Sequence, residues 1–403
     1  MNILQLCHKV PFPPKDGGCI AMNNLTQGLI NEGHKVKVLA INTKKHFIDI
    51  QSLPSDYRLQ TNIDAVNVDT SINITAAFAN LFTDKSYNIE RFFSKSFEEK
   101  LIETLKSKEF DIVQLESLFM CMYISTIRKY SKAKIVLRAH NVEHIIWERT
   151  AQQEKNLFKK AYLNLLAKRL KNYELQALQT VDAIAAITKK DETYFRKSVI
   201  SKPIQTFPFG IDLNHTLQIS PEKEEYPSVF HIGAMDWQPN IEGINWFLNN
   251  VWDKVQAKHP QLKLYLAGRN MSLEFKQLKK TNVIIVGEID NAYQFIQSKG
   301  IMIVPLLSGG GMRVKIIEGL ALGKTIITTQ VGAEGIDCEN NKNFIIANDA
   351  VQFSEAISKC ISDKTFYSEI GKNAKILALQ NYNNADICKS LTDFYKIILL
   401  NKN

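Results

Sequence analysis

A glycine-rich segment carries the clearest chemical signal in this chain. Residues 308–324 read SGGGMRVKIIEGLALGK and lie between two short apolar runs that predict parallel strands. Its glycines would let a ligand approach backbone N–H groups, and the helix expected next would point its positive dipole end at the same loop. Arg313 and Lys315 add positive charges in the first helical turn. The pattern indicates a diphosphate site, and a glycine-rich connection with solvated basic side chains is the alternative.

Alternating strands and helices must hold the candidate residues in place. In the first half, apolar runs predict strands at Asn2–Leu6, Lys35–Ile41, Asp111–Leu115, Lys134–Leu137 and Val181–Ile187. An apolar face between Gly18 and Glu32 predicts a helix, which Gly33 would end. Strands that alternate with helices are typical of a parallel sheet covered on both faces. Residues 42–110 give no clear pattern.

The second half repeats this organisation after a polar stretch, Leu213–Tyr226, which is the best candidate for a linker. Further strands are predicted at Val229–Ile232, Leu262–Ala267, Val283–Val286, Ile301–Pro305, Thr325–Thr328 and Asn343–Ile346. The expected fold class is α/β, with two Rossmann-like doubly wound domains that face a cleft.

A basic helical segment is predicted from about Glu143 to Thr180. Its leucines recur at three- and four-residue spacing, and no acidic residue occurs between Lys155 and Tyr173. Such a helix can lie on anionic lipid, or it can present an ordinary solvated face while its apolar stripe packs on a core.

Length, charge and cysteine content limit the possible domain organisation, ligands and location of the protein. A length of 403 residues favours two or three domains, and a net charge of +9 suits an anionic ligand, an anionic membrane or nucleic acid. The six cysteines lack metal-ligand spacing and fit a reducing cytosol, so no metal site is expected. No run approaches the roughly 18 apolar residues that span a bilayer. We expect a cytoplasmic protein, or at most one bound peripherally at the inner face of the plasma membrane. We expect no nucleic-acid partner.

Several motifs together resemble the GT-B-fold glycosyltransferases, particularly bacterial enzymes of retaining family 4 (glycosyl transferases group 1). The matching stretches of the second half are HIGAMDWQPNIEGINWFL from His231, LKLYLAGRN from Leu262, VGEIDNAYQFI from Val286, the glycine-rich segment, and TTQVGAEGI from Thr328. Those of the first half are PFPPKDGG at Pro11–Gly18 and LRAHNVEH at Leu137–His144. The resemblance implies an acceptor-binding domain over 1–210, a nucleotide-sugar-binding domain over 211–381, and a helix in 382–403 that packs back on the first.

The resemblance also implies roles for individual residues. Arg313 and Lys315 would stabilise the charge on the leaving nucleotide diphosphate, and His140 would lie near the transferred sugar. The predicted catalytic residues are His140, Arg313 and Lys315. The predicted substrate contacts are Gly17, Gly18, Glu116, Arg138, Asn141, Glu143, Tyr293, Gly309, Gly310, Gly311, Met312 and Glu318. Of these, Glu318 would hold the ribose and Tyr293 would lie near the base. A structural histidine at 140 and a helix-start acid at 143 are the alternatives.

Two departures from the family pattern bear on activity. Counting back eight residues from Glu318 reaches Gly310, where the family has a first glutamate that touches the donor sugar. The family usually has an Arg and a Lys after the first strand of the second domain, where this chain has MDWQPN. Arg313 and Lys315 would then take over the phosphate contacts.

The predicted function is transfer of a hexose-type sugar from a nucleotide diphosphate sugar to a hydroxyl of a glycan or lipid-linked acceptor, in bacterial surface polysaccharide synthesis. The resemblance implies a retaining, metal-independent reaction, with no cofactor besides the donor substrate. A catalytically silent glycan- or nucleotide-sugar-binding relative and a nucleotide-sugar epimerase are the alternatives. A dinucleotide-dependent dehydrogenase would need Gly-x-Gly-x-x-Gly directly after a strand, which neither glycine-rich segment supplies.

Overall fold

A computed structural model describes residues 1–199, 201–213 and 223–400 of the chain, so most of the predicted linker Leu213–Tyr226 lies outside the described residues. The chain divides into one unit of Met1–Pro208 with Ala385–Asn403, and a second of Phe209–Asn384. The boundaries predicted from the sequence, after residue 210 and before residue 382, differ from these by a few residues.

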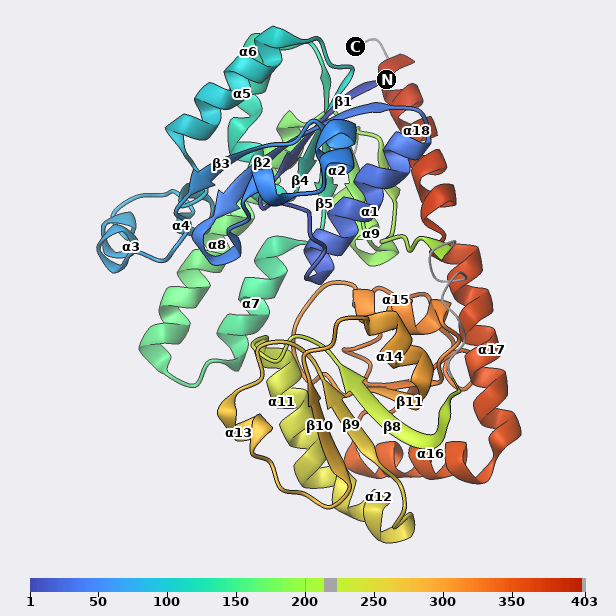
Figure 1. Cartoon of the computed structure of the whole chain (residues 1–403). Helices are drawn as coiled ribbons and strands as arrows, with labels where there is room; N and C mark the ends of the chain where they lie inside the picture. The colour runs from blue at the N-terminus through green and yellow to red at the C-terminus, as the bar shows by residue number, and fades with distance from the viewer. Residues whose placement is uncertain (200, 214–222, 401–403) are drawn as a thin grey trace. The chain divides into compact units, whose positions relative to one another are not determined.

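The first unit is built on a seven-stranded parallel sheet of order β3-β2-β1-β4-β5-β6-β7. Its strands are β1 Asn2–Cys7, β2 Lys35–Thr43, β3 Asp64–Val68, β4 Ile112–Glu116, β5 Lys134–Ala139, β6 Ala183–Ala186 and β7 Ile204–Thr206. Helices cover both faces of the sheet (Figure 1). Successive side chains of a strand point to opposite faces, so Ile3 packs in one core and Leu4 in the other. This double burial explains why the strands read as continuous apolar runs.

Strand β3, short helices, 3₁₀ turns and helix α5 account for the region that the sequence left unassigned. The helices of the first unit are α1 Gly17–Asn31, α2 Ser55–Thr61, α3 Ile74–Asn80, α4 Tyr87–Glu90, α5 Lys95–Ser107, α6 Ile124–Tyr130, α7 Glu143–Gln153, α8 Leu157–Thr180, α9 Lys189–Ser198 and the C-terminal α18 Asn384–Leu400. Helix α18 belongs to this unit because Leu391, Tyr395 and Ile398 are buried in its core beside Val38.

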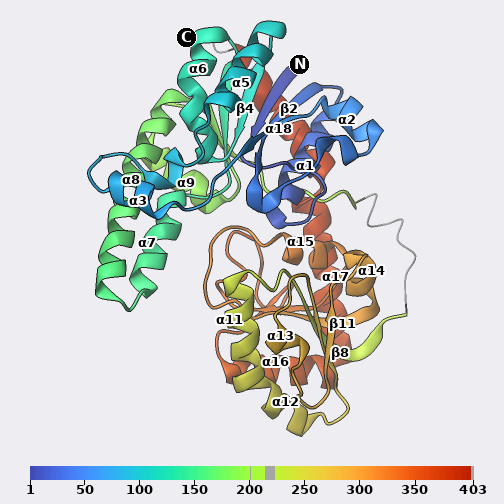
Figure 2. The same ribbon diagram turned by 60° about the vertical axis from the view of Figure 1, so that its left-hand side comes forward.

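The single helix predicted from Glu143 to Thr180 is two helices, α7 and α8, that pack side by side (Figure 2). Helix α7 ends at Gln153, and the Asn156 side chain accepts a hydrogen bond from the Lys159 backbone N–H to begin α8. Leu163, Leu166 and Leu170 of α8 are buried, whereas Leu157 and Phe158 at its start are exposed.

The second unit contains a six-stranded parallel sheet of order β10-β9-β8-β11-β12-β13. Its strands are β8 Glu225–Ile232, β9 Leu264–Ala267, β10 Val283–Gly287, β11 Lys299–Val304, β12 Ile326–Thr328 and β13 Ile345–Ile346. Its helices are α11 Gln238–Phe247, α12 Asp253–Lys258, α13 Leu273–Lys276, α14 Ala292–Ser298, α15 Val314–Ala321, α16 Ala350–Ser362 and α17 Lys364–Asn381, with a π-helical turn at Leu248–Trp252. Trp252 is buried in the core, whereas Trp237 is 37% exposed.

Both sheets wind outward from a central strand in the same order, which confirms the predicted α/β class with two doubly wound sheets. In such sheets ligands bind beyond the carboxyl ends of the two strands at which the winding reverses. Those strands are β1 and β4 in the first unit, and β8 and β11 in the second. No helix of the described residues is long and apolar enough to cross a membrane.

Candidate functional site

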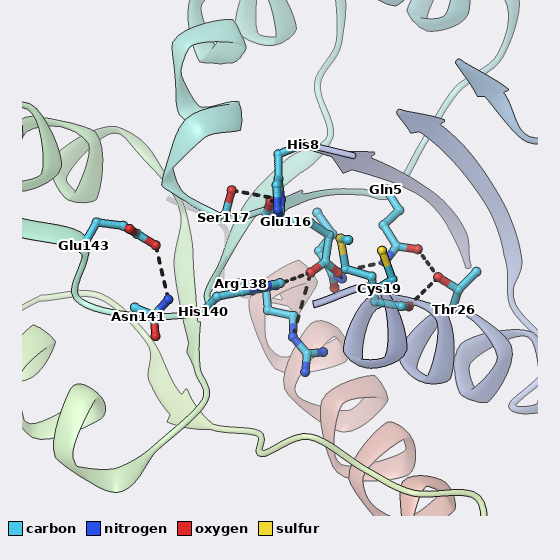
Figure 3. Close-up of polar contacts among 12 residues, drawn as sticks. Gln5, His8, Cys19, Thr26, Glu116, Ser117, Arg138, His140, Asn141 and Glu143 are labelled. Carbon is cyan, nitrogen blue, oxygen red and sulfur yellow. Dashed lines mark hydrogen bonds and ion pairs between the residues drawn. The ribbon is translucent and has the colours of Figure 1, made fainter. Parts of the chain in front are cut away.

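A buried carboxylate stands at the reversal point of the first unit. Glu116 ends β4, is fully buried, and accepts a 2.8 Å hydrogen bond from Gln5 of β1 at its Oε1 atom. Thr26 of α1 donates in turn to Gln5 Oε1 at 2.6 Å. On the other side, His140 Nε2 lies 2.7 Å from Glu116 Oε2 (Figure 3). A single carboxylate therefore links β1, α1 and the loop that follows β5.

Charged neighbours keep this carboxylate ionised. Burial alone would raise the pKa of Glu116, but the hydrogen bond from His140 and the positive charge of Arg138 lower it to about 2. An ionised carboxylate only accepts hydrogen bonds, so Nε2 of His140 must carry a proton. Glu116 thus fixes the orientation of the His140 ring and places a proton on its Nε2 atom. His140 is the histidine predicted to lie near the transferred sugar.

Residues that the sequence did not single out complete this arrangement. His8 follows β1 and donates from Nδ1 to the Glu116 carbonyl at 2.9 Å, and its ring meets that of His140 edge-on at 5.9 Å. Burial and the nearby Lys9 lower the pKa of His8 to about 3, which keeps its ring neutral. Ser117 adopts φ 94°, a strained conformation for a residue other than glycine and one that recurs at functional sites.

The C-terminal helix also reaches this carboxylate. The Tyr395 hydroxyl of α18 donates to Gln114 Oε1, and the Gln114 amide donates to Glu116 Oε1. No local sequence signal could reveal Tyr395, because it lies far along the chain from β4.

Two predicted contacts of the first unit do not reach its surface. Glu116 is 0% exposed and Arg138 is 1% exposed, so in this structure both act on neighbouring side chains rather than directly on a ligand. Asn141 donates to Glu143 at 3.3 Å, and burial together with the charge of Glu174 raises the pKa of Glu143 to about 7. The Glu143 backbone N–H donates to the Glu174 carboxylate at 3.0 Å, which caps the start of α7.

Two of the predicted substrate contacts, Gly17 and Gly18, lie in the first turn of a helix. Gly17 and Gly18 begin α1, and the Asp16 side chain caps it by accepting from the Cys19 N–H at 2.9 Å. Although burial would raise the pKa of Asp16, the Lys9 ammonium 2.7 Å away lowers it to about 2. Asp16 is therefore an ion-paired helix cap.

In the second unit, the glycine-rich segment forms the loop between β11 and α15. Gly309 and Gly311 adopt φ 103° and 79°, which other residues rarely adopt. Arg313 is buried as the N-cap residue of α15; its guanidinium donates to the Gly310 carbonyl and lies 5.3 Å from the centre of the Trp237 ring. Met312 is also buried. The loop thus places two basic side chains at the start of a helix.

Three nitrogen atoms converge on Gly233, directly after β8. Lys315 Nζ donates to Asn240 Oδ1 at 2.7 Å. A Cβ atom at Gly233 would lie 2.7 Å from Lys315 Nζ, 2.8 Å from Asn240 Nδ2 and 3.3 Å from His231 Nε2. His231 is fully buried, donates from Nδ1 to the Ile303 carbonyl, and has no partner at Nε2. The absence of a side chain at Gly233 leaves room for a ligand atom beside these groups.

The remaining predicted residues of this unit adjoin the same helix. Burial and the charge of Arg313 lower the pKa of Lys315 to about 7. Burial raises the pKa of Glu318 to about 7 against the opposing effects of a Tyr293 hydrogen bond and Lys315. The structure therefore brings together Arg313, Lys315, Glu318 and Tyr293, and adds Gly233, Asn240 and His231. The last three lie within the HIGAMDWQPN stretch, which was the available signal.

Metal ligands do not gather at either site. In the parts of the chain that the structure describes, no three His, Cys, Asp or Glu side chains are placed to hold an ion.

Comparison with known proteins matches both units to one class of enzyme. Residues 17–215 match the family described as Glycosyltransferase Family 4, and residues 226–363 match Glycosyl transferases group 1. Each half of the chain therefore matches a family of glycosyltransferases. A Klebsiella pneumoniae protein described as an uncharacterized 44.6 kDa protein in the cps region is 24% identical over 404 residues, which cover 97% of this chain and 98% of that one.

Solved structures of glycosyltransferases share the fold over the whole chain. Sucrose-phosphate synthase from Thermosynechococcus elongatus is 15% identical, with a TM-score of 0.71 and full coverage of both chains. TarM, which is from S. aureus, is 11% identical with a TM-score of 0.69, and each chain is covered to 98%. Anabaena HepE in complex with UDP-glucose is 13% identical with a TM-score of 0.65, covering 98% of this chain and all of that one. These likenesses confirm the predicted GT-B fold.

Proposed function

We propose that this glycosyltransferase moves a hexose-type sugar from a nucleotide diphosphate sugar to a hydroxyl of a glycan or lipid-linked acceptor, in the synthesis of a bacterial surface polysaccharide. The main support for this proposal is the group of Arg313, Lys315 and Asn240 around the glycine-rich loop and Gly233. This group lies at the reversal point of the second sheet. The structural relative HepE binds UDP-glucose, and the relative from Klebsiella is encoded in a cps region.

The proposed reaction is a retaining transfer. The bond between C1 of the sugar and the diphosphate oxygen breaks, a bond from C1 to the acceptor oxygen forms on the same face, and the acceptor proton passes to the leaving diphosphate. Arg313 and Lys315 would stabilise the negative charge that develops on that diphosphate, a role that a metal ion fills in other enzymes. Glu318 would accept a hydrogen bond from the ribose, and Glu116 would orient His140 toward the sugar.

Binding and hydrolysis of candidate donors test the proposal. The chain is screened by thermal shift and nucleotide release against UDP-, GDP-, dTDP- and CMP-sugars, in EDTA and without acceptor. Stabilisation by one diphosphate sugar with slow release of its nucleotide supports the transferase and identifies the donor. Activity that EDTA abolishes would contradict metal independence, and conversion of the donor to an epimer would favour the epimerase. Binding without turnover, even with acceptor glycans, would favour a silent relative, for which the missing glutamate at Gly310 is the motivating observation.

A further inference from the structure

The His8 ring stands directly after β1, at the reversal point of the first sheet. Cys7 of β1 pairs with Glu116 of β4, so His8 and Ser117 are the first residues beyond these two strand ends. The Nδ1 atom of His8 lies 2.9 Å from the Glu116 carbonyl oxygen and 3.2 Å from Ser117 Oγ (Figure 3). Within the part of the chain that the structure describes, no hydrogen bond reaches Nε2 of this ring. His8 is only half-buried, so a ligand can reach that nitrogen.

The contacts of the His8 ring determine which nitrogen carries its proton. A carbonyl oxygen only accepts hydrogen bonds, so Nδ1 must be the protonated nitrogen. Burial and the charge of the nearby Lys9 lower the pKa of His8 to about 3, so the ring carries a single proton at neutral pH. Nε2 therefore presents a lone pair, which accepts a hydrogen bond and cannot donate one.

Three neighbours hold the His8 ring in this orientation. Phe119 packs against it with the ring centres 6.1 Å apart, and His140 meets it edge-on at 5.9 Å. The third neighbour is the Glu116 carbonyl, which precedes the strained backbone of Ser117 at φ 94°. Two hydrogen bonds from the Ser117 N–H, each 3.1 Å long, stabilise that conformation. Strained backbone persists where the surrounding structure requires it, and here it supports the group that accepts the His8 proton.

A lone pair in this position restricts the chemistry of its ligand. An ionised phosphate or carboxylate oxygen also only accepts hydrogen bonds, so neither can bind Nε2 of His8. The neighbouring cation, Lys9, is held by both carboxylate oxygens of Asp16, at 2.7 and 2.9 Å. An uncharged hydroxyl can donate to Nε2, and ligands of doubly wound sheets bind beyond these strand ends. The geometry therefore suits a sugar hydroxyl and not a phosphate.

We propose that His8 is a specificity-determining residue that accepts a hydrogen bond at Nε2 from an uncharged hydroxyl of a bound sugar. The inference rests on the proposed function, which supplies that sugar from the donor or from the acceptor. Glu116 then serves two histidines, because its side chain orients His140 and its backbone carbonyl orients His8. A sugar without the recognised hydroxyl would leave Nε2 unpaired, and this loss is the basis of the discrimination.

Replacement of His8 by asparagine and by glutamine separates this role from a structural one. In His8→Asn the amide can still donate to the Glu116 carbonyl, but the side chain is too short to reach the position of Nε2. In His8→Gln the longer side chain can bring its amide oxygen to that position. His8→Asn should lower kcat/KM for UDP-glucose, or for the donor that the screen identifies, roughly twofold to tenfold, and His8→Gln should recover most of the loss. A purely structural role predicts the opposite order.

A matched control changes a histidine of the second unit. The Nε2 atom of His259 lies 3.0 Å from Ser358 Oγ, so its ring contacts belong to a different environment. His259→Asn should therefore react as wild type does in the same nucleotide-release assay. Wild-type kinetics in His8→Asn would overturn the proposal, and so would a loss in His8→Gln that exceeds the loss in His8→Asn.

Singly deoxygenated sugars identify the hydroxyl and its source. Wild type and His8→Asn are compared with deoxy forms of UDP-glucose without acceptor, and then with deoxy forms of glucose as an added acceptor. Removal of the recognised hydroxyl should cost wild type roughly twofold to tenfold and should cost His8→Asn nothing further. This coupling in the first series assigns the hydroxyl to the donor, and coupling only in the second assigns it to the acceptor. Equal losses in wild type and His8→Asn throughout both series would overturn the proposal.

Nitrogen NMR of the full chain with isotope-labelled histidine tests the ring without any substrate. The His8 signals, assigned by their loss in His8→Asn, should show a protonated Nδ1 and an unprotonated Nε2 at neutral pH. A proton on Nε2, or titration near the ordinary histidine pKa of about 6.5, would overturn the inference even where transfer is confirmed. A wild type that turns over no donor would instead remove the proposed function, and with it the sugar that His8 would bind.

Discussion

Replacement of Gly233 by alanine tests whether the groups around it bind the donor phosphates. A Cβ atom there would lie 2.7 Å from Lys315 Nζ and 2.8 Å from Asn240 Nδ2, closer than such atoms approach in proteins. Both neighbours are ends of side chains rather than backbone, so they should move aside while the fold persists. Gly233→Ala should therefore displace the Lys315 ammonium without removing it from the protein.

Gly233→Ala should weaken donor binding but change the free energy of unfolding little. A charge-assisted hydrogen bond contributes about 1.5–3 kcal/mol, so loss of the Lys315 contact should weaken donor binding roughly 10- to 150-fold. The backbone at Gly233 is outside the left-handed region, and alanine also restricts the unfolded chain by about 0.4–1 kcal/mol. The melting temperature should then change by only a few degrees.

A double-mutant cycle distinguishes displacement of Lys315 from a general disturbance. Calorimetric titration of UDP-glucose, or of the donor that the screen identifies, is carried out on wild type, Gly233→Ala, Lys315→Met and the double variant. If both changes remove one contact, the double variant binds no more weakly than Lys315→Met alone. Wild-type affinity in Gly233→Ala, or penalties that simply add, would refute the reasoning.

Three further predictions follow from the charged groups. Arg313→Ala should raise the donor KM or lower kcat by roughly one to two orders of magnitude in steady-state assays, because it removes one charge-assisted contact, and unchanged kinetics would exclude Arg313 from the site. Since the pKa of Lys315 is about 7, donor affinity should fall above pH 7 in calorimetry, and a dependence that survives Lys315→Met would contradict this origin. The pKa of Glu116 falls from 4.5 to about 2, which corresponds to about 3 kcal/mol of stability, present above pH 4.5 and lost as the pH falls toward 2. Urea unfolding of Glu116→Gln should show lower stability at pH 7 and a shallower acid loss than wild type; an unchanged pH profile would show that Glu116 does not carry the effect.

The central strands could be predicted because both faces of each sheet are covered, which makes them nearly continuous apolar runs. The edge strands β3 and β7 of the first sheet were not predicted. Residues 42–110 were not interpreted because most of them form short helices and turns, and the one strand there, β3, is a five-residue edge strand. The longer helix α5 in this region was missed. The break between α7 and α8 was missed for a different reason. Leu157 and Phe158 continue the apolar composition of the helix, and periodicity alone does not show that the chain doubles back or that these two side chains stay exposed.

Spacing alone shows that residues of the candidate site lie together only where they are neighbours in sequence. Arg313, Lys315 and Glu318 share one helix start, so their spacing already places them together. The environment of Glu116 is assembled from β1, α1, the loop after β5 and α18. Tyr395 contributes to it from the end of the chain, and Ser117 through a backbone conformation that its residue type does not favour. Only the folded topology brings such residues together.

The buried ionisable groups at the two reversal points differ in their pKa values, and this difference is consistent with different roles for the two units. In the first unit the pKa of Glu116 is about 2 and that of His8 is about 3, so both groups keep one protonation state near neutral pH. In the second unit Lys315 and Glu318 both have a pKa of about 7. An anionic diphosphate beside Lys315 would raise the pKa of its amine and so favour the protonated form. Protonation of Lys315 should therefore couple to donor binding, whereas Glu116 and His8 should keep their protonation states and their geometry.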